Sequence, residues 1–173
     1  MKQFFASFGF ITVLLSLFGC GSTPTGKLKP KAIVPDTPLM SFYYVEHGTM
    51  ANPNFSYELH RLDDGTIKMT RFNMYKFGFD EEADTIRDGM ETVTVGEEVM
   101  DTLLTIIREE NVLDYDERYE PPFEVLDGES WSLSIEFKDT PAFHSHGNNA
   151  VPGGKGLSRF EKYLHRLTYP GDD

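Results

Sequence analysis

Two histidines in the C-terminal part of the chain could bind a metal ion. His144 and His146 lie two residues apart in a segment that we expect to be a strand, so both imidazoles would point to the same side of it. Zinc binds histidine nitrogens but needs at least three protein ligands, and no cysteine lies nearby to serve as the third. The spacing is therefore more typical of exposed histidines at a strand end, and we predict no metal or other cofactor.

Two further segments match ligand-binding motifs only in part. Acidic residues between positions 80 and 91 follow the spacing of a calcium loop, but Thr85 stands where the sharp turn requires glycine. Gly153–Ser158 contains the Gly-Lys pair of a phosphate-binding loop, but Asn149 stands where its first glycine belongs. The chain contains no Gly-x-Ser-x-Gly nucleophile motif. We therefore predict no catalytic residues and expect that the protein is not an enzyme.

The single cysteine, Cys20, follows an apolar N-terminal segment. The run from Phe4 to Phe18 consists mainly of large apolar side chains and follows Lys2, a pattern typical of a signal peptide. It is shorter than the roughly 20 apolar residues of a membrane-spanning helix. Because exported proteins mostly use cysteines in pairs, a single cysteine at this place indicates that its sulfur is modified.

The residues Leu17-Phe18-Gly19-Cys20 resemble the lipobox of bacterial lipoprotein precursors, although Phe18 departs from the small residue usual at its position. The resemblance implies cleavage before Cys20, a diacylglyceryl group on its sulfur, and acylation, as by palmitate, of the new amino group. Two or more such chains hold a protein stably on a bilayer, because each buried methylene contributes about 0.8 kcal/mol. Gly21 provides no acidic retention signal, so the resemblance implies a periplasm-facing location on the outer membrane.

Composition divides the chain into three parts. We expect a signal peptide at residues 1–19, the lipidated cysteine with a proline- and lysine-rich tether at 20–38, and a single globular domain at 39–173. The domain contains 12 basic and 27 acidic residues, a net charge of −15, and such a surface repels phosphate backbones. We therefore exclude nucleic acid as a partner, and expect the lipid bilayer through Cys20 and an envelope protein or peptide.

Periodicity predicts the elements of this domain. Ser130–Phe137 alternates apolar and polar side chains and is the clearest strand. The acidic glycine turn at 63–66 predicts a hairpin of strands 57–62 and 67–74, with a bulge or an edge strand where the apolar phase slips between Met69 and Phe72. Weaker strands are expected at 41–45, 91–95 and 142–145.

Helical spacing predicts helices at about 97–107, with a capping box formed by Thr94 and Glu97, and at about 157–167. The order of these elements predicts an α+β fold, with one mainly antiparallel sheet and two amphipathic helices packed on one face. The stretch from Asp127 to Leu167, with its alternating Trp131-x-Leu133-x-Ile135-x-Phe137, looks like one that recurs in small uncharacterised bacterial domains. That resemblance implies architecture and no activity.

The loop at 144–149 contains the candidate ligand-binding residues His144, His146, Asn148 and Asn149, because polar side chains at the end of a rigid sheet suit a binding site. A structural connector is the other role open to it. We expect a membrane-anchored lipoprotein whose acidic domain binds a protein, peptide or envelope component. The alternatives are a metal-assisted hydrolase that uses His144 and His146, and a purely structural envelope protein.

Overall fold

The computed structural model describes residues 30–48, 53–80, 85–123, 125 and 128–169. From Lys31 onward these residues belong to one compact unit, and the description that follows is confined to it. The predicted signal peptide, Cys20 and the tether up to residue 29 lie outside the described residues. So does part of the acidic segment considered as a calcium loop, at residues 81–84.

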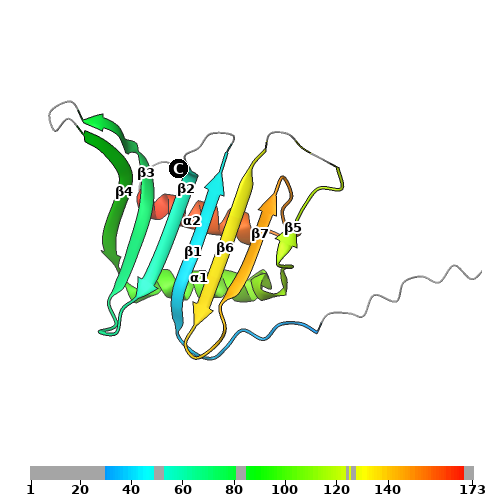
Figure 1. Ribbon diagram of the computed structural model, residues 1–173. Coiled ribbons are helices and arrows are strands. Elements are labelled where there is room, and N and C mark those ends of the chain that lie inside the picture. Colours follow the sequence, from blue (N-terminus) through cyan, green and yellow to red (C-terminus); the bar gives the residue numbers. More distant parts are fainter. Residues whose placement is uncertain (1–29, 49–52, 81–84, 124, 126–127, 170–173) are drawn as a thin grey trace, which may run out of the picture. The chain divides into compact units, whose positions relative to one another are not determined.

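Seven strands of the described part form a single sheet in the order β4-β3-β2-β1-β6-β7-β5 (Figure 1). Their bounds are β1 Leu39–His47, β2 Pro53–Arg61, β3 Ile67–Asp80, β4 Thr85–Val95, β5 Arg118–Tyr119, β6 Ser130–Phe137 and β7 Phe143–Asn148. Neighbouring strands are antiparallel except for the two-residue β5, which runs parallel to β7. The predicted α+β domain with one mainly antiparallel sheet is therefore confirmed.

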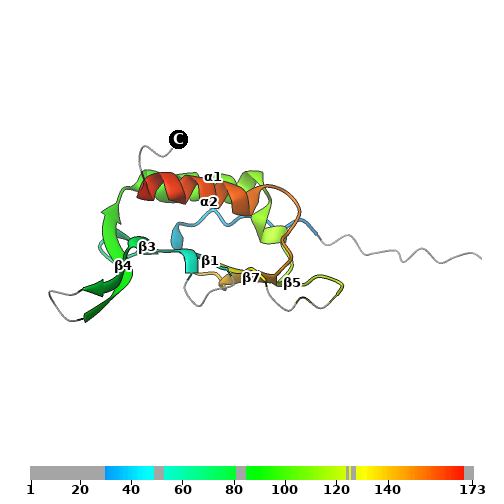
Figure 2. The same cartoon turned by 90° about the horizontal axis from the view of Figure 1, so that it is seen from above.

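Two α-helices accompany the sheet in the described residues, α1 (Glu97–Glu109) and α2 (Gly156–Thr168), with a short 3-10 helix η1 (Val112–Asp114) after α1. The helices lie side by side along the sheet (Figure 2). The ring of Phe160 in α2 packs edge-on against Phe42 of β1, with 4.9 Å between ring centroids. This contact joins helix and strand in one core.

The core combines apolar side chains from the strands and from both helices in one cluster. The alternation of β6 is confirmed, since its four apolar residues are all buried: Trp131, Leu133, Ile135 and Phe137. Burying a large apolar side chain contributes about 1.5–3 kcal/mol. The alternation therefore identified the face of β6 that belongs to the core.

The predicted hairpin between β2 and β3 is confirmed. Asp64 Oδ1 accepts a hydrogen bond from the backbone N–H of Thr66 at 2.8 Å, and Gly65 adopts a φ of +84°, which glycine tolerates without steric cost. The register of β3 with β4 shifts between Phe72 and Phe77. Because β3 pairs with strands on both sides, the edge-strand alternative for the phase slip is wrong.

The predicted capping box of α1 is also wrong. Gly96 is the N-cap residue of the helix and makes no side-chain cap hydrogen bond. Thr94 still belongs to β4, where its hydroxyl accepts a hydrogen bond from Lys68 Nζ at 2.7 Å. The threonine is therefore engaged across the sheet and does not reach the helix start.

Residues at the end of the predicted tether contact the domain. The backbone N–H of Ala32 donates to Asp114 Oδ1 at 2.5 Å, and Val34 packs against the core. The carbonyl of Pro38 accepts a hydrogen bond from the N–H of Lys138 at 3.0 Å. The chain therefore lies on the domain surface before β1 begins.

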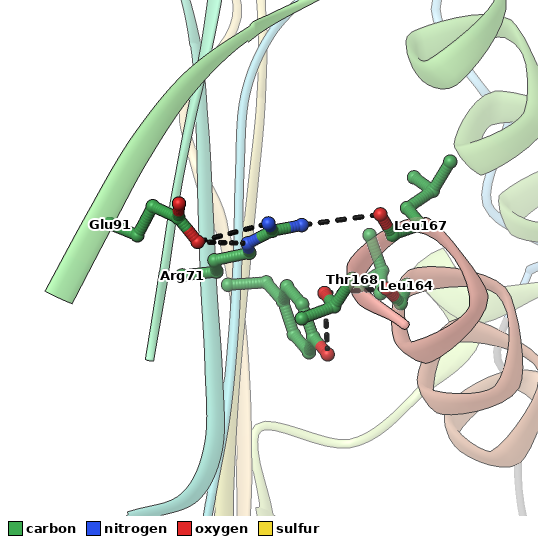
Figure 3. A network of polar contacts seen from close by, with 6 residues as sticks. Arg71, Glu91, Leu164, Leu167 and Thr168 are labelled. Carbon is green, nitrogen blue, oxygen red and sulfur yellow. Dashed lines mark hydrogen bonds and ion pairs between the residues drawn. The ribbon is translucent and has the colours of Figure 1, made fainter. Parts of the chain in front are cut away.

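The C-terminal end of α2 is tied to the sheet by polar contacts (Figure 3). Arg71 of β3 pairs with Glu91 of β4, with 3.0 Å between Nη2 and Oε2, and its Nη1 donates to the carbonyl of Leu167 at 3.2 Å. A cation at this place complements the partial negative charge of a helix C-terminus. The buried hydroxyl of Thr168 lies 3.3 Å from that of Tyr57. We name these contacts the closed end of α2.

Candidate ligand-binding pocket

A pocket of about 730 Å³ opens beside the first turns of α2. Its volume falls within the usual range for small-ligand sites, roughly 300–1,000 Å³. Its walls come from β1, from the residue after η1, from the start of β6 and the residues before it, from the loop after β7, and from α2. The lining residues are Tyr44, Glu46, Tyr115, residues 128–131, residues 149–152, Gly154, Leu157, Ser158 and Glu161. We name this region the open end of α2.

Asn149 holds the loop after β7 against the start of β6. Its backbone has a φ of +52°, a left-handed conformation that asparagine adopts more readily than most residues. Its N–H donates to the carbonyl of Glu129 at 2.8 Å, and its Oδ1 accepts the N–H of Glu129 at 3.0 Å. A Cβ on Gly128 would lie 1.7 Å from that Oδ1. These contacts fix the position of Glu129 at the pocket.

Trp131 fixes the next part of the same loop. Its indole N–H donates to the carbonyl of Ala150 at 2.8 Å, and its ring packs against Tyr119 with 5.8 Å between centroids. Gly147 allows this approach, because a Cβ there would lie 2.4 Å from the indole nitrogen. The next residue, Val151, is left 68% exposed at the pocket rim.

The start of α2 is held by α1 and by the residue after η1. Glu110, the residue directly after α1, accepts hydrogen bonds from the N–H of Lys155 at 3.2 Å and from Arg159 Nη1 at 2.8 Å. A Cβ on Gly156 would lie 2.2 Å from the hydroxyl of Tyr115, so helix and tyrosine approach closely there. The guanidinium of Arg159 is thus occupied by α1, where it also pairs with Glu109 at 2.7 Å.

Three carboxylates give the pocket a negative potential. Glu46 is half-buried, while Glu129 and Glu161 are exposed. Burial raises the pKa of the Glu46 carboxyl above its ordinary value, and the charges of Glu161 and Glu129 raise that pKa further. None of the described lining residues is basic. The carboxyls could therefore attract a cation, or Glu46 could hold a proton nearer neutral pH than an ordinary glutamate does.

The inner surface of the pocket is aromatic. Tyr44, Tyr115 and Trp131 line it and are each at most 7% exposed, so their rings belong to the core and offer only an edge or part of a face. The hydroxyl of Tyr44 donates to Glu46 Oε2 over 3.5 Å. An apolar floor beneath carboxylates suits a ligand with an apolar body and a positive end.

The predicted binding residues do not form one site. Asn149 lines the pocket, but its side chain is occupied by Glu129 and by Asn148. Asn148 lines a neighbouring cavity of about 340 Å³. His144 and His146 are exposed and alternate with buried Ser145 and Gly147, which places the imidazoles on the sheet face away from the core.

The two histidines also lack partners for a metal site within the described residues. There, no group of three or more His, Cys, Asp and Glu side chains is arranged to hold a metal ion. Across the sheet His144 lies opposite Ser134, and His146 opposite Ser132. The metal-assisted hydrolase therefore gains no support from this part of the chain.

Sequence reasoning missed Glu46, Glu129 and Glu161. One signal for Glu46 was available, because β1 carries Phe42, Tyr44 and Glu46 at alternate positions and so places this glutamate on the face of two buried aromatic residues. No comparable signal marks Glu129 or Glu161. They reach the pocket through tertiary packing alone.

Neither α-helix of the described part has the length and apolar composition needed to cross a bilayer. No family model matches the sequence, and comparison with curated proteins gives no significant match.

Proposed function

We propose that this protein is a lipid-anchored protein of the bacterial cell envelope whose acidic domain binds a protein or peptide in the pocket at the open end of α2. The observation that carries the binding role is this pocket of about 730 Å³, with its apolar floor and acidic rim. Catalysis is not part of the proposal. The lipid anchor rests on the lipobox-like Leu17-Phe18-Gly19-Cys20, which lies outside the described residues.

We further infer that the two amphipathic helices pack on one face of the sheet and leave its other face to solvent. The side-by-side helices in Figure 2 and the core cluster that includes residues of both support this arrangement. The exposed His144, His146 and Glu136 on alternate strand positions support a solvated opposite face. The pocket then opens on the helix side of the sheet.

Replacing Cys20 by alanine tests the anchor. We expect wild-type protein in the membrane fraction and C20A protein uncleaved or released, because the acyl chains supply the attachment. Mass spectrometry of the mature N-terminus should find a diacylglyceryl group on the Cys20 sulfur. An unmodified cysteine, or C20A protein that is cleaved and yet as firmly membrane-bound as wild type, would contradict the anchor.

A photo-crosslinking residue placed at Ser158 or at His144 tests the binding role in intact cells. Both positions are exposed, but Ser158 lines the pocket and His144 lies on the opposite sheet face. We expect a discrete protein or peptide product from position 158 and none from position 144. A product from position 144 alone would place binding on the originally predicted loop, and no product at either position would contradict the binding function.

A further inference from the structure

We propose that the open end of α2 binds a lysine or arginine side chain in a basic segment of a peptide or protein partner. The alkyl stem would lie over the aromatic floor, and the cation would face Glu46, Glu129 and Glu161. This inference rests on the proposed binding function and names the chemistry of its ligand.

The shape and lining of the cavity support a long side chain with an apolar stem. About 730 Å³ accommodates a lysine or arginine side chain together with neighbouring atoms of its peptide. These side chains bury their methylene groups along apolar surface and keep the charged end among polar groups. Tyr44 and Trp131 offer an edge or part of a face to the stem, and a cation within about 6 Å of an aromatic face is attracted to it.

The negative charge of the region favours a positively charged ligand. No described residue forms an ion pair with Glu46, Glu129 or Glu161. The nearby Arg159 is occupied by Glu109 and Glu110. The chain as a whole has a net charge of −12, which attracts a basic partner over longer distances.

Glu46 is the carboxylate whose charged form such a ligand would stabilise most. Its half-buried carboxyl has a raised pKa because burial and two nearby carboxylates disfavour its charged form. A cation in the pocket would favour the charged form again and lower that pKa. Binding should therefore release a proton wherever Glu46 is partly protonated in the free protein.

The surroundings of the pocket favour a peptide over a free amine. Asn149 lines both this pocket and the adjoining cavity of about 340 Å³. Each cavity is lined by one exposed apolar residue. Val151 lines the pocket and Phe123 lines the adjoining cavity, and each is 68% exposed. Residues that flank the basic side chain in a peptide would contact these surfaces, whereas a small amine would leave them uncovered.

Calorimetric titration of the mature lipidated protein in detergent micelles tests the inference. The probe is a capped Ala-Leu-Lys-Leu-Ala peptide, with a second peptide carrying norleucine in place of lysine and 1,5-diaminopentane as a free amine. We expect saturable binding of the lysine peptide that weakens as salt is raised, and at least tenfold weaker binding of both other compounds.

Variants of the protein distinguish binding at this pocket from general electrostatic attraction to an acidic protein. Replacing both Glu46 and Glu161 by glutamine should weaken binding of the lysine peptide at least tenfold. Glu136→Gln removes one exposed charge on the outer face of β6 and should leave binding within twofold of wild type. Thermal unfolding of each variant verifies that it is folded at the titration temperature.

Each contrary result has a defined meaning. Equal binding of the norleucine peptide, or unchanged binding in the double variant, would contradict the inference that the ligand is a cation. Equal binding of diaminopentane would contradict the inference that the ligand is a peptide and not a free amine. If position 158 yields a crosslinked partner in cells but the lysine peptide does not bind, this inference fails and the proposed function stands; if both experiments fail, both proposals fall.

Discussion

The two ends of α2 meet the rest of the domain in different ways. At the closed end, Arg71 and Thr168 satisfy polar groups between helix and sheet (Figure 3). At the open end, Glu161 and Glu46 line a pocket whose described walls contain no cation. Both ends of the helix are held to the rest of the domain, at the N-terminal end by the contacts of Glu110 and Glu109 with Lys155 and Arg159, but only the open end also presents carboxylates without a cationic partner in the described walls.

The side chains of α2 explain this difference. Phe160 and Leu164 are fully buried, and Thr168 is buried one turn later, so the buried stripe of the helix is continuous toward its C-terminus. Toward the N-terminus, Gly156 contributes no side chain and Leu157 is only half-buried. The core therefore thins where the pocket begins.

The largest effect is expected at Phe160, a core residue of α2 that belongs to neither end. Phe160→Ala removes a fully buried ring that contacts Phe42, and should lower the free energy of unfolding by about 3–5 kcal/mol. Chemical denaturation measures this loss. The exposed Ser158→Ala on the same helix should stay within about 0.5 kcal/mol of wild type, and similar losses in both variants would contradict the assigned core.

The closed end should contribute to stability without affecting binding. Arg71→Met removes the guanidinium that pairs with Glu91 and donates to the carbonyl of Leu167, so we expect the free energy of unfolding to fall by about 2 kcal/mol. Arg166→Met, in the exposed last turn of α2, is the matched control and should lose less than about 0.5 kcal/mol. A weaker affinity for the lysine peptide in folded Arg71→Met protein would break the separation of the two ends.

The packing of Trp131 at the open end should depend on the position of the loop after β7. In Gly147→Ala the new methyl group would lie 2.3 Å from the carbonyl oxygen of Ala150 and 2.4 Å from the Trp131 nitrogen. Relieving such overpacking costs about 1–3 kcal/mol, and it should shift the emission of Trp131, the single tryptophan of the chain. Gly153→Ala has nothing within 4 Å of its new methyl group and should leave the spectrum unchanged; a shift in both variants would count against the close packing at Gly147.

The smallest effect concerns pH. Because the pKa of Glu46 is raised in the folded state, ionisation of Glu46 destabilises the fold, and this loss develops as pH rises from the ordinary carboxyl pKa through the raised one. Glu46→Gln should therefore unfold at a higher temperature than wild type at pH 7, with the difference vanishing at about pH 3, below both pKa values.

Glu110→Gln provides the opposite case. Arg159 and the N–H of Lys155 lower the pKa of Glu110, so its ionised form stabilises the fold above its ordinary pKa. This variant should unfold at a lower temperature than wild type at pH 7, with the difference shrinking as pH falls through the lowered pKa. The same sign in both variants at pH 7 would contradict the directions assigned to the pKa values of Glu46 and Glu110.

The elements were predictable where the local pattern was strong. The alternation of β6 and the turn at Gly65 both reflect interactions within a few residues, and both are confirmed. The site depends on long-range packing instead. Period-two spacing placed His144 and His146 on one side of β7. The residues that alternate with them and face the core are Ser145 and Gly147, and their small size gave no indication of which side is buried.

The pocket itself was beyond local patterns. It forms where β1, the start of β6 and the start of α2 meet, and these segments are brought together only by the fold. Glu46 could have been singled out as a charged residue at an inward strand position, whereas Glu161 looks like any exposed helix residue until α2 is placed.

Fluorescence titration of Trp131 with the lysine peptide tests the central claim most directly, because this single tryptophan lines the pocket. We predict a saturable change in emission that is lost when Glu46 and Glu161 are both replaced by glutamine and is kept in Glu136→Gln. Unchanged emission on adding the peptide, or an equal response to the norleucine peptide, would contradict the claim that the open end of α2 receives a basic side chain.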